Sequence, residues 1–420
     1  MVGGHVRPSG NKNAALPLLA ACLLTDEDVT LENLPEIRDV HAMLEILEGI
    51  GVTVTRVEPG KVVLRASALA SREPDPKLSR RIRASILLAG PLLARRGRVR
   101  LPPPGGDVIG RRRIDTHVLG LEALGARFFA SPEALSFSLE TRLRGAEIFL
   151  DEASVTGTEN VIMAAALADG ETTIMNAAGE PHVQELCHLV NAMGGQISGI
   201  GTNTLHITGV PRLHGARHVI GPDYIEVGSL IAMAAVTGGE LHLQGARMAD
   251  HRATRIAFGK LGIHFEGTNG GDDILVPGGQ RLVVKQELNN AIPKIEDAPW
   301  PMFPADLTSI AVVAATQAEG TTMIHEKMFE SRLFFVDRLQ SMGAQVILCD
   351  PHRVVISGKA QLWGQELSSP DIRAGMALVI AALCAKGKSV IHNVGQIDRG
   401  YERIDERLAA LGARIKRCAD

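Results

Sequence analysis

A short phrase recurs six times along the chain, and it constrains the fold more than any other feature of the sequence. In each copy an amphipathic segment ends in a hydrophobic residue and a glycine, and a short strand-like segment follows. The six marker glycines are separated by 68 to 81 residues, and they are Gly51, Gly125, Gly194, Gly262, Gly343 and Gly412. A glycine directly after a helical pattern is typical of a left-handed C-cap, where a Cβ is penalised. The sequence therefore predicts six copies of one structural unit.

Each copy carries two kinds of helix. An apolar segment such as ENVIMAAALA comes first, a short strand such as ETTIMNA follows, and the amphipathic helix and usually a hairpin come after it. A helix that is apolar all round is buried, whereas a one-sided helix lies on the surface. The pattern predicts an α/β (α+β) fold of six αβαββ-type units, with the apolar helices inside. Because 420 residues exceed what one hydrophobic core usually serves, we expect two domains of three units each.

Composition excludes several classes of protein. Lys and Arg total 44 against 47 Asp and Glu, so bulk charge does not favour a nucleic acid or an anionic membrane as partner. The apolar helices are too short to span a bilayer, and the first residues lack the apolar core of a signal peptide. Five scattered cysteines show no metal-binding spacing and suit a reducing compartment. We therefore expect a cytoplasmic protein without a metal site.

Polar residues stand where the six apolar helices are expected to begin, and they differ between the copies. Helix N-termini carry unpaired N–H groups and a partial positive charge, so they suit anions. Ser, Thr and Asp at these places are ordinary N-caps when taken singly. Four cations do not fit that interpretation, because a cation at a helix start opposes the helix dipole; they are Lys12, Arg81, Arg83 and Arg373. We interpret these cations as ligand contacts.

A glycine-rich segment at 102–117, PPPGGDVIGRRRIDTH, is a second candidate site. It holds Asp107 and three consecutive arginines at 111–113. Such a basic loop can simply be solvated, but as a mobile lid it would carry both an anion clamp and an acid. A third candidate, IDRGYERIDERL, places Arg399 beside a glycine before a helix, although this stretch can also be a salt-bridged surface.

Together, SGNKNAALP, PPPGGDVIGRRRIDTH, TGTEN and IDRGYERI make the sequence resemble the enolpyruvyl transferase (EPSP synthase) family over residues 3–416. The resemblance implies two inverse α/β barrels of three units each. We place the first at 12–221, including the lid loop at 102–117. The second is placed at 1–11 and 222–420, with the active site in the cleft between the two barrels.

The resemblance also implies an activity. The sequence is similar to the branch that transfers the enolpyruvyl group of phosphoenolpyruvate to the 3-hydroxyl of UDP-N-acetylglucosamine, with release of phosphate. This implies addition and elimination through a tetrahedral intermediate, without cofactor or metal, for peptidoglycan synthesis and hence for cell shape, the cell cycle and cell division. Two alternatives stay open: transfer to 3-phosphoshikimate, against which SGNKN argues, and a non-catalytic paralogue that binds a UDP-sugar. The oligomeric state is left open.

Single residues receive roles from the same resemblance. The residues implied to bind phosphoenolpyruvate are Lys12, Arg83, Arg112, Arg332, Arg373 and Arg399. The residues implied to bind the UDP-sugar are Asn13, Arg83, Arg112, Arg113, Ile114, Asp115, Thr116, Ser154, Val155, Thr156, Asp306 and Met328. The residues implied to be catalytic, with Asp371 in support, are Lys12, Asp107, Asp306 and Arg399.

Two aspartates carry the expected proton transfers. Asp306 resembles the carboxylate beside the attacking 3-hydroxyl and is the candidate base, with an N-cap as its alternative role. Asp107 stands where the commonest family members have a cysteine, which is regarded as an acid and as the target of the epoxide fosfomycin. A carboxylate is a far poorer nucleophile than a thiolate toward this drug, so we expect insensitivity. Leu87, Arg113 and Tyr224 are further departures from the common family sequence.

Overall fold

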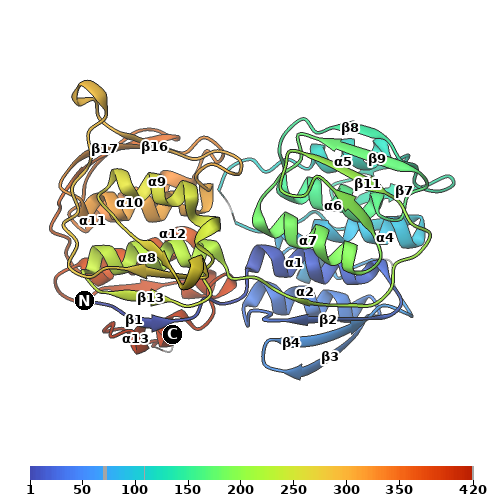
Figure 1. Cartoon of the computed structure of the whole chain (residues 1–420), viewed down its shortest axis with the longest axis horizontal. Helices are drawn as coiled ribbons and strands as arrows, with labels where there is room; N and C mark the ends of the chain where they lie inside the picture. Colours follow the sequence, from blue (N-terminus) through green and yellow to red (C-terminus); the bar gives the residue numbers. More distant parts are fainter. Residues whose placement is uncertain (70–72, 108, 419–420) are drawn as a thin grey trace. The chain divides into compact units, whose positions relative to one another are not determined.

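The computed structural model describes residues 1–69, 73–107 and 109–418. It divides into two compact units. The first unit comprises Gly10–Asp107 and Arg112–Gly221, coloured blue to green in Figure 1. The second unit comprises Met1–Ser9, Val108–Arg111 and Pro222–Asp420, mostly coloured yellow to red. Residue 108 of the expected lid loop lies outside the described residues, and the stretch 109–111 groups with the second unit.

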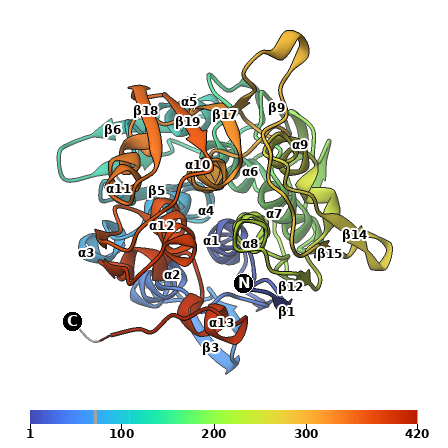
Figure 2. The ribbon, with the colours of Figure 1, turned by 90° about the vertical axis from the view of Figure 1, so that its left-hand side faces the viewer.

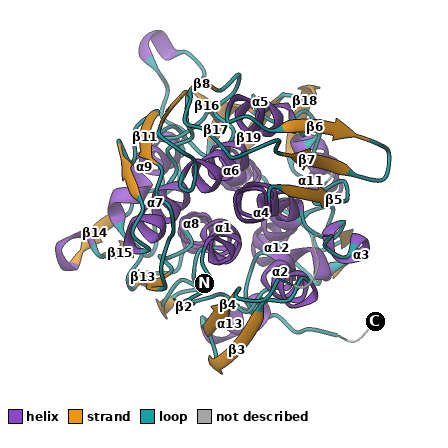
Figure 3. Cartoon of the chain, turned by 90° about the vertical axis from the view of Figure 1, so that its right-hand side faces the viewer, coloured by secondary structure: helices purple, strands orange, loops and turns teal. Residues whose placement is uncertain are grey.

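In the first unit, three mostly buried helices lie at the centre and other helices surround them (Figure 3). The central helices are α1 (Lys12–Ala21), α4 (Ala89–Arg96) and α6 (Val155–Ala165). The surrounding helices are α2 (Arg38–Gly49), α3 (Pro76–Ser79), α5 (Asp115–Ala123) and α7 (Pro181–Ala192). Leu, Ala, Val, Ile and Met side chains of the central helices form one continuous core. The predicted division into buried and surface helices is confirmed in this unit.

The second unit repeats this plan (Figure 2). Its central helices are α8 (Tyr224–Thr237), α10 (Thr308–Gln317) and α12 (Ile372–Cys384). Its outer helices are α9 (Arg252–Lys260), α11 (Val336–Ser341) and α13 (Ile404–Ala410). The unit has an apolar core of its own, as two separately folded halves require.

One buried helix departs from its expected continuous form. The segment RASILLAGPLLA begins as a 3₁₀ turn, η2 (Arg83–Leu88), and becomes α-helical only at Ala89. Pro91 explains the change, because proline lacks the N–H of an α-helical hydrogen bond and its ring clashes with the carbonyl four residues earlier. The α-helix therefore starts so close to Pro91 that the proline lies in its first turn, where the missing N–H costs nothing.

Among the residues that the structure describes, six sheets cover the central helices, three in each unit. The strands of the first unit are β2 (Asp28–Glu32), β3 (Thr53–Glu58), β4 (Lys61–Arg65), β5 (Arg98–Leu101), β6 (Arg127–Ala130), β7 (Leu135–Ser138), β8 (Glu147–Phe149), β9 (Glu171–Met175), β10 (Gln196–Ser198), β11 (Thr204–Thr208) and β12 (Ala216–Val219). Their sheet orders are β12-β2-β4-β3, β5-β7-β6 and β10-β11-β9-β8. The strands of the second unit are β1 (Gly4–Val6), β13 (Leu241–Leu243), β14 (Glu266–Thr268), β15 (Asp273–Val276), β16 (Lys294–Glu296), β17 (Gly320–His325), β18 (Gln345–Asp350), β19 (Arg353–Gly358), β20 (Glu366–Ser368) and β21 (Val390–His392). Their sheet orders are β1-β13-β15-β14, β16-β17-β19-β18 and β20-β21.

Several sheets contain a parallel strand that the repeat pattern did not predict. β8 follows the second copy but pairs in parallel with β9 of the third, and β12 follows the third copy but pairs in parallel with β2 of the first. β1 pairs in parallel with β13 in the same way, so the first nine residues belong to the second unit. Each such strand covers an edge that would otherwise expose unpaired backbone groups. The last copy also differs, because no hairpin follows α13 among the described residues.

The six marker glycines all adopt the left-handed conformation. Their φ angles lie between 78° and 101°, in the region that an L-residue with a Cβ rarely occupies. The prediction of six left-handed caps is confirmed. No helix of the described residues is both long and apolar enough to cross a membrane.

Substitution of Gly125 by alanine is expected to lower the urea midpoint of unfolding. Its φ of 101° makes a Cβ cost about 1 kcal/mol, although the nearest atom, the carbonyl oxygen of Arg142, would lie 4.0 Å away. Gly49→Ala is the matched control, because Gly49 ends α2 with open space around the added Cβ and alanine favours a helix. If both variants unfold at the wild-type midpoint, the left-handed cap is not what selects glycine.

Candidate active site

The first unit holds a buried ion pair at the start of a central helix. Lys12 is the first residue of α1, and its Nζ lies 2.9 Å from Oδ2 of Asp39 in the first turn of α2. Both side chains are less than one-tenth exposed. Asn11 caps α1, since its side-chain oxygen accepts from the backbone N–H of Asn13 at 2.9 Å. The carboxylate of Asp39 thus compensates the positive charge of Lys12, which the positive end of the α1 dipole disfavours.

Sequence reasoning missed Asp39, although its position carries a signal. Asp39 lies on the same face of α2 as Ala42, Met43 and Ile46, and all four residues are buried. A carboxylate on the apolar face of an amphipathic helix requires a buried partner. The sequence shows this conflict but does not show which cation resolves it.

Arg83 connects the start of η2 to the end of the expected lid loop. Its Nη2 donates to the carbonyl oxygens of Arg112 at 2.8 Å and Arg113 at 2.9 Å. Burial, with a smaller contribution from the charge of Arg112, lowers the pKa of Arg83 to about 10. A Cβ on Gly106, whose φ is 104°, would lie 2.8 Å from Cβ of Arg83 and 3.3 Å from Nη1 of Arg112. Because Gly106 has no Cβ, the chain directly before Asp107 can lie against Arg83 and Arg112.

Beyond the loop, three residues predicted to bind the UDP-sugar share one partner network. Arg113 donates to Oδ2 of Asp115 at 3.1 Å and to Oδ2 of Asp151 at 3.0 Å. The hydroxyl of Thr116 donates to Oδ1 of Asp151 at 2.7 Å. Ile114 lies between them, half-buried, directly before α5. The network fixes the path of the chain from the loop into α5.

The N-terminus of α6 carries the second group of predicted UDP-sugar ligands. Ser154 is its N-cap, because its Oγ accepts from the backbone N–H of Gly157 at 3.2 Å. Val155 and Thr156 form the first turn and are half-buried. The Oγ1 of Thr156 lies 3.1 Å from Nε2 of the buried His117.

In the second unit, one carboxylate is held between two buried arginines. Nη2 of Arg332 donates to Oδ1 of Asp306 at 3.0 Å. Arg373 donates to Oδ2 from Nε at 3.0 Å, and its Nη2 lies 2.9 Å from the same oxygen. The Asp306 side chain remains 28 % exposed, whereas both arginine side chains are at most 4 % exposed. The N-cap interpretation of Asp306 is wrong, because neither η6 (Ala305–Leu307) nor α10 receives a side-chain cap.

Each arginine is supported from its other side. Nε of Arg332 lies 3.5 Å from Oε2 of the buried Glu326, and the guanidinium of Arg373 lies 5.5 Å from the ring centre of Tyr401. Burial, with a smaller contribution from the charge of Asp297, raises the pKa of Glu326 to about 8 against the opposing charge of Arg332. No separate signal in the sequence points to Glu326 or Tyr401.

Three remaining predicted residues occupy simpler places. Asp371 caps α12, because its Oδ1 accepts from the backbone N–H groups of Arg373 at 2.8 Å and Ala374 at 2.9 Å. Arg399 ends the 3₁₀ turn η8 (Val394–Arg399), and its Nη1 donates to Oε1 of Gln396 at 3.0 Å. Met328 has an exposed side chain.

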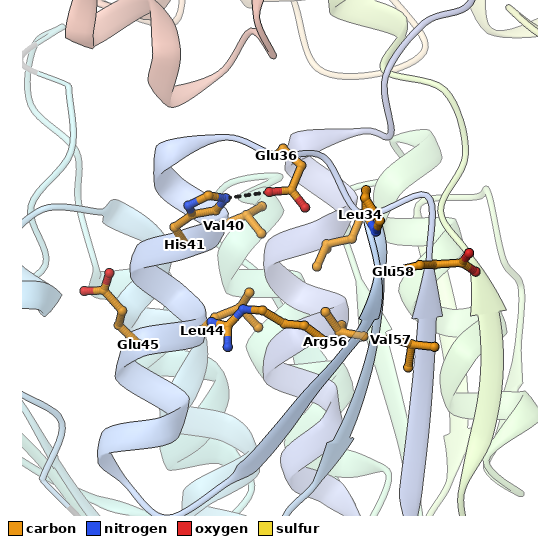
Figure 4. A pocket seen from close by; sticks show the side chains of 11 residues that line it. Leu34, Glu36, Val40, His41, Leu44, Glu45, Arg56, Val57 and Glu58 are labelled. Atoms are coloured by element: carbon orange, nitrogen blue, oxygen red, sulfur yellow. Dashed lines mark hydrogen bonds and ion pairs between the residues drawn. The ribbon is translucent and has the colours of Figure 1, made fainter.

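A separate hollow on the first unit does not hold the predicted residues. It has a volume of about 380 Å³ and lies between α2 and the hairpin of β3 and β4 (Figure 4). His41 and Glu36 form an exposed ion pair at its rim, 3.0 Å apart. Glu45 and Glu58 also line it, and with Glu36 they outnumber the one arginine there, Arg56, which makes the hollow a poor site for an anionic substrate. Within the described chain, no cluster of His, Cys, Asp and Glu is suited to a metal ion.

The chain resembles proteins of known family along nearly its whole length. The family described as EPSP synthase (3-phosphoshikimate 1-carboxyvinyltransferase) matches residues 1–408. A protein of Treponema denticola named UDP-N-acetylglucosamine 1-carboxyvinyltransferase is 56% identical over 417 residues, which cover 99% of this chain and 96% of that protein. A protein of Bradyrhizobium diazoefficiens with the same name is 54% identical over 416 residues, with the same coverage.

Solved structures share the fold at low sequence identity. The enolpyruvyl transferase NikO from Streptomyces tendae has a TM-score of 0.86 and 23% identity, and the similarity covers 99% of this chain and 96% of NikO. An EPSP synthase from Acinetobacter baumannii has a TM-score of 0.76 and 19% identity, covering 100% of this chain and 98% of that one. These likenesses confirm the two-domain α/β fold class.

Replacement of Asp39 by alanine is expected to destabilise the chain by about 3 kcal/mol, because the ammonium of Lys12 would remain buried without its nearest counter-charge. Glu48→Ala is the control on the same helix, since Glu48 pairs with Arg56 on the exposed surface and such pairs contribute less than about 1 kcal/mol. Urea unfolding at low salt measures both losses. Similar losses in the two variants would contradict the distinction between the buried and the exposed pair.

Proposed function

The chain belongs to the EPSP synthase family, and we propose that it transfers the enolpyruvyl group of phosphoenolpyruvate to the 3-hydroxyl of UDP-N-acetylglucosamine, releasing phosphate. The choice of acceptor is supported by the relatives of that name, which are more than half identical to this chain. The observation that carries the chemistry is Asp306, a partly exposed carboxylate that two buried arginines orient. On this proposal the enzyme works in the cytoplasm at the first committed step of peptidoglycan synthesis, and so serves cell shape and division.

The substrates are anions, and the candidate cations suit them. Phosphoenolpyruvate carries a phosphate and a carboxylate, both of which arginine binds with two parallel hydrogen bonds. We assign Lys12, Arg112 and Arg399 to the phosphate that leaves. Arg332 and Arg373 already hold Asp306, so their charge also favours a substrate carboxylate beside it.

The reaction needs two opposed proton transfers. The 3-hydroxyl loses its proton as its oxygen attacks C2 of phosphoenolpyruvate, while the methylene carbon gains one, and the product is a tetrahedral phospho-adduct. Asp306 is proposed to accept the hydroxyl proton and Asp107 to supply the carbon-bound one. Elimination then removes a methyl proton and breaks the C2–O bond to phosphate, which restores the double bond. No step requires a metal or an organic cofactor.

Asp306→Asn is expected to lower kcat by about a hundredfold or more, because the amide keeps the shape but cannot accept the proton. The assay measures phosphate release from phosphoenolpyruvate with UDP-N-acetylglucosamine, and the enolpyruvyl mass increment of the product. Asp337→Asn is the control, since Asp337 pairs with Arg338 on the exposed surface.

The same assay separates the alternatives. Release with 3-phosphoshikimate alone as acceptor would identify the sister reaction. UDP-sugar binding without turnover of either acceptor by the wild-type protein would identify the non-catalytic paralogue instead. In that case Asp306→Asn should bind the UDP-sugar as well as the wild type does.

Fosfomycin is expected to leave the wild-type enzyme active and to inactivate Asp107→Cys progressively. In the variant the thiolate attacks an epoxide carbon, a C–S bond forms, the C–O bond breaks and the resulting alkoxide takes up a proton. A carboxylate at the same place is a much weaker nucleophile. The wild type also controls for attack elsewhere, because Cys349 and Cys418 are exposed in both proteins. Time-dependent loss of wild-type activity would overturn this expectation.

A further inference from the structure

A buried asparagine in α6 has its amide orientation fixed by two backbone groups. Oδ1 of Asn160 accepts from the backbone N–H of Gly90 at 2.7 Å, and Nδ2 donates to the carbonyl oxygen of Ile86 at 2.9 Å. The reverse orientation would place donor against donor and acceptor against acceptor. Asn160 is fully buried, so water cannot relieve such a conflict. Its Nδ2 is therefore a donor to every partner it meets.

Asn160 in turn fixes the proton of His117. Nδ2 of Asn160 lies 2.8 Å from Nδ1 of His117, which must accept and therefore carries no proton. Burial, with a smaller contribution from the charge of Arg83, lowers the pKa of His117 to about 3, so the ring is neutral. The single ring proton must then be on Nε2.

The tautomer of His117 determines the direction of its hydrogen bond with Thr156. Nε2 lies 3.1 Å from Oγ1 of Thr156, so the ring donates and the hydroxyl oxygen accepts. Among the described residues, the Thr156 hydroxyl makes no other hydrogen bond, and its side chain is half-buried in the first turn of α6. Its own hydrogen therefore remains to be donated to an acceptor from outside the chain.

We propose that His117 is a positioning residue that makes the Thr156 hydroxyl donate to an acceptor oxygen of the bound UDP-sugar. This oxygen belongs to a uracil carbonyl, a diphosphate or the acetamido carbonyl, all of which accept and none of which donates. The inference rests on the proposed function, because it assumes that the UDP-sugar reaches the N-terminus of α6. It adds to that function a series of hydrogen bonds with fixed donors, from Asn160 through His117 and Thr156 to the substrate.

The first test compares Thr156→Val with Thr156→Ser. Valine keeps the shape but removes the donor, so the Kd and KM for UDP-N-acetylglucosamine should rise about fivefold to tenfold. The KM for phosphoenolpyruvate and kcat should change less than twofold, because the lost bond is made equally in the ground and transition states. Serine retains the hydroxyl and should restore most of the affinity. Unchanged affinity in Thr156→Val would overturn the inference.

The second test asks whether His117 acts through Thr156. His117→Phe removes the donor and fills a similar volume, so it should weaken UDP-sugar binding by a similar factor. Adding it to Thr156→Val should cause no further loss, since both changes remove one interaction. Losses that multiply in the double variant would show that His117 does not act through this hydroxyl.

Thr158→Val is the structural control on the same helix. Its hydroxyl is fully buried and accepts from the backbone N–H of Ala178 at 3.0 Å, so the variant should be less stable but bind the UDP-sugar normally. Melting temperatures of all variants separate lost binding from lost folding. If Thr158→Val weakens binding as much as Thr156→Val, the effect is general to the helix and the inference is wrong.

Ligand titrations keep the inference and the proposed function apart. If the wild type and Thr156→Val bind UDP-N-acetylglucosamine with the same Kd, the inference is wrong but the proposed function is not affected. Wild-type protein that does not bind this ligand removes both. Where the inference holds, titrations with uridine, UDP and the UDP-sugar identify the acceptor oxygen. The smallest of these ligands that binds Thr156→Val more weakly than the wild type contains that oxygen.

Discussion

Each unit depends on three central helices that are mostly apolar and mostly buried. Such a helix is stable in water only when other elements surround it, and sheets and one-sided helices do so here. The ends of these helices are where their charged and polar side chains can reach a ligand, whereas polar groups inside them, such as Asn160, bond to neighbouring parts of the chain. Lys12, Ser154 and Arg373 all lie at the N-terminal ends of central helices, so the candidate ligands of each unit are a direct consequence of how its core is built.

Cations at these helix ends are buried, and specific carboxylates of the chain compensate their charge. Asp39 compensates Lys12, and Asp306 lies between Arg332 and Arg373. A buried ion pair contributes little net stability, but losing one partner is costly, so each cation stays in one place. That rigidity suits binding of small anions, for which charge must be fixed before the substrate arrives.

Burial also controls where protons are bound in this chain. His117 is neutral with its proton on Nε2, because Asn160 donates to its Nδ1 and burial penalises the charged ring. Burial also raises the pKa of Glu326. These groups orient their neighbours and are poor candidates for exchange with a substrate. The two aspartates proposed to move protons differ from them: Asp306 is partly exposed, and Asp107 follows a glycine-rich stretch.

The sequence by itself determined the six units, the buried and surface helices, the left-handed glycines and the cations at the helix starts. All of these depend on residues within a few turns of one another, such as the apolar run of α6 or the φ of Gly125. Only the tertiary structure decided which charges pair, that Asp306 is clamped instead of capping α10, and that β12 completes the sheet of β2. Such pairings join residues far apart in the chain, and local periodicity carries no information about them. The tautomer of His117 is of the same kind, because Asn160 and Thr156 fix it only once α5 and α6 have packed together.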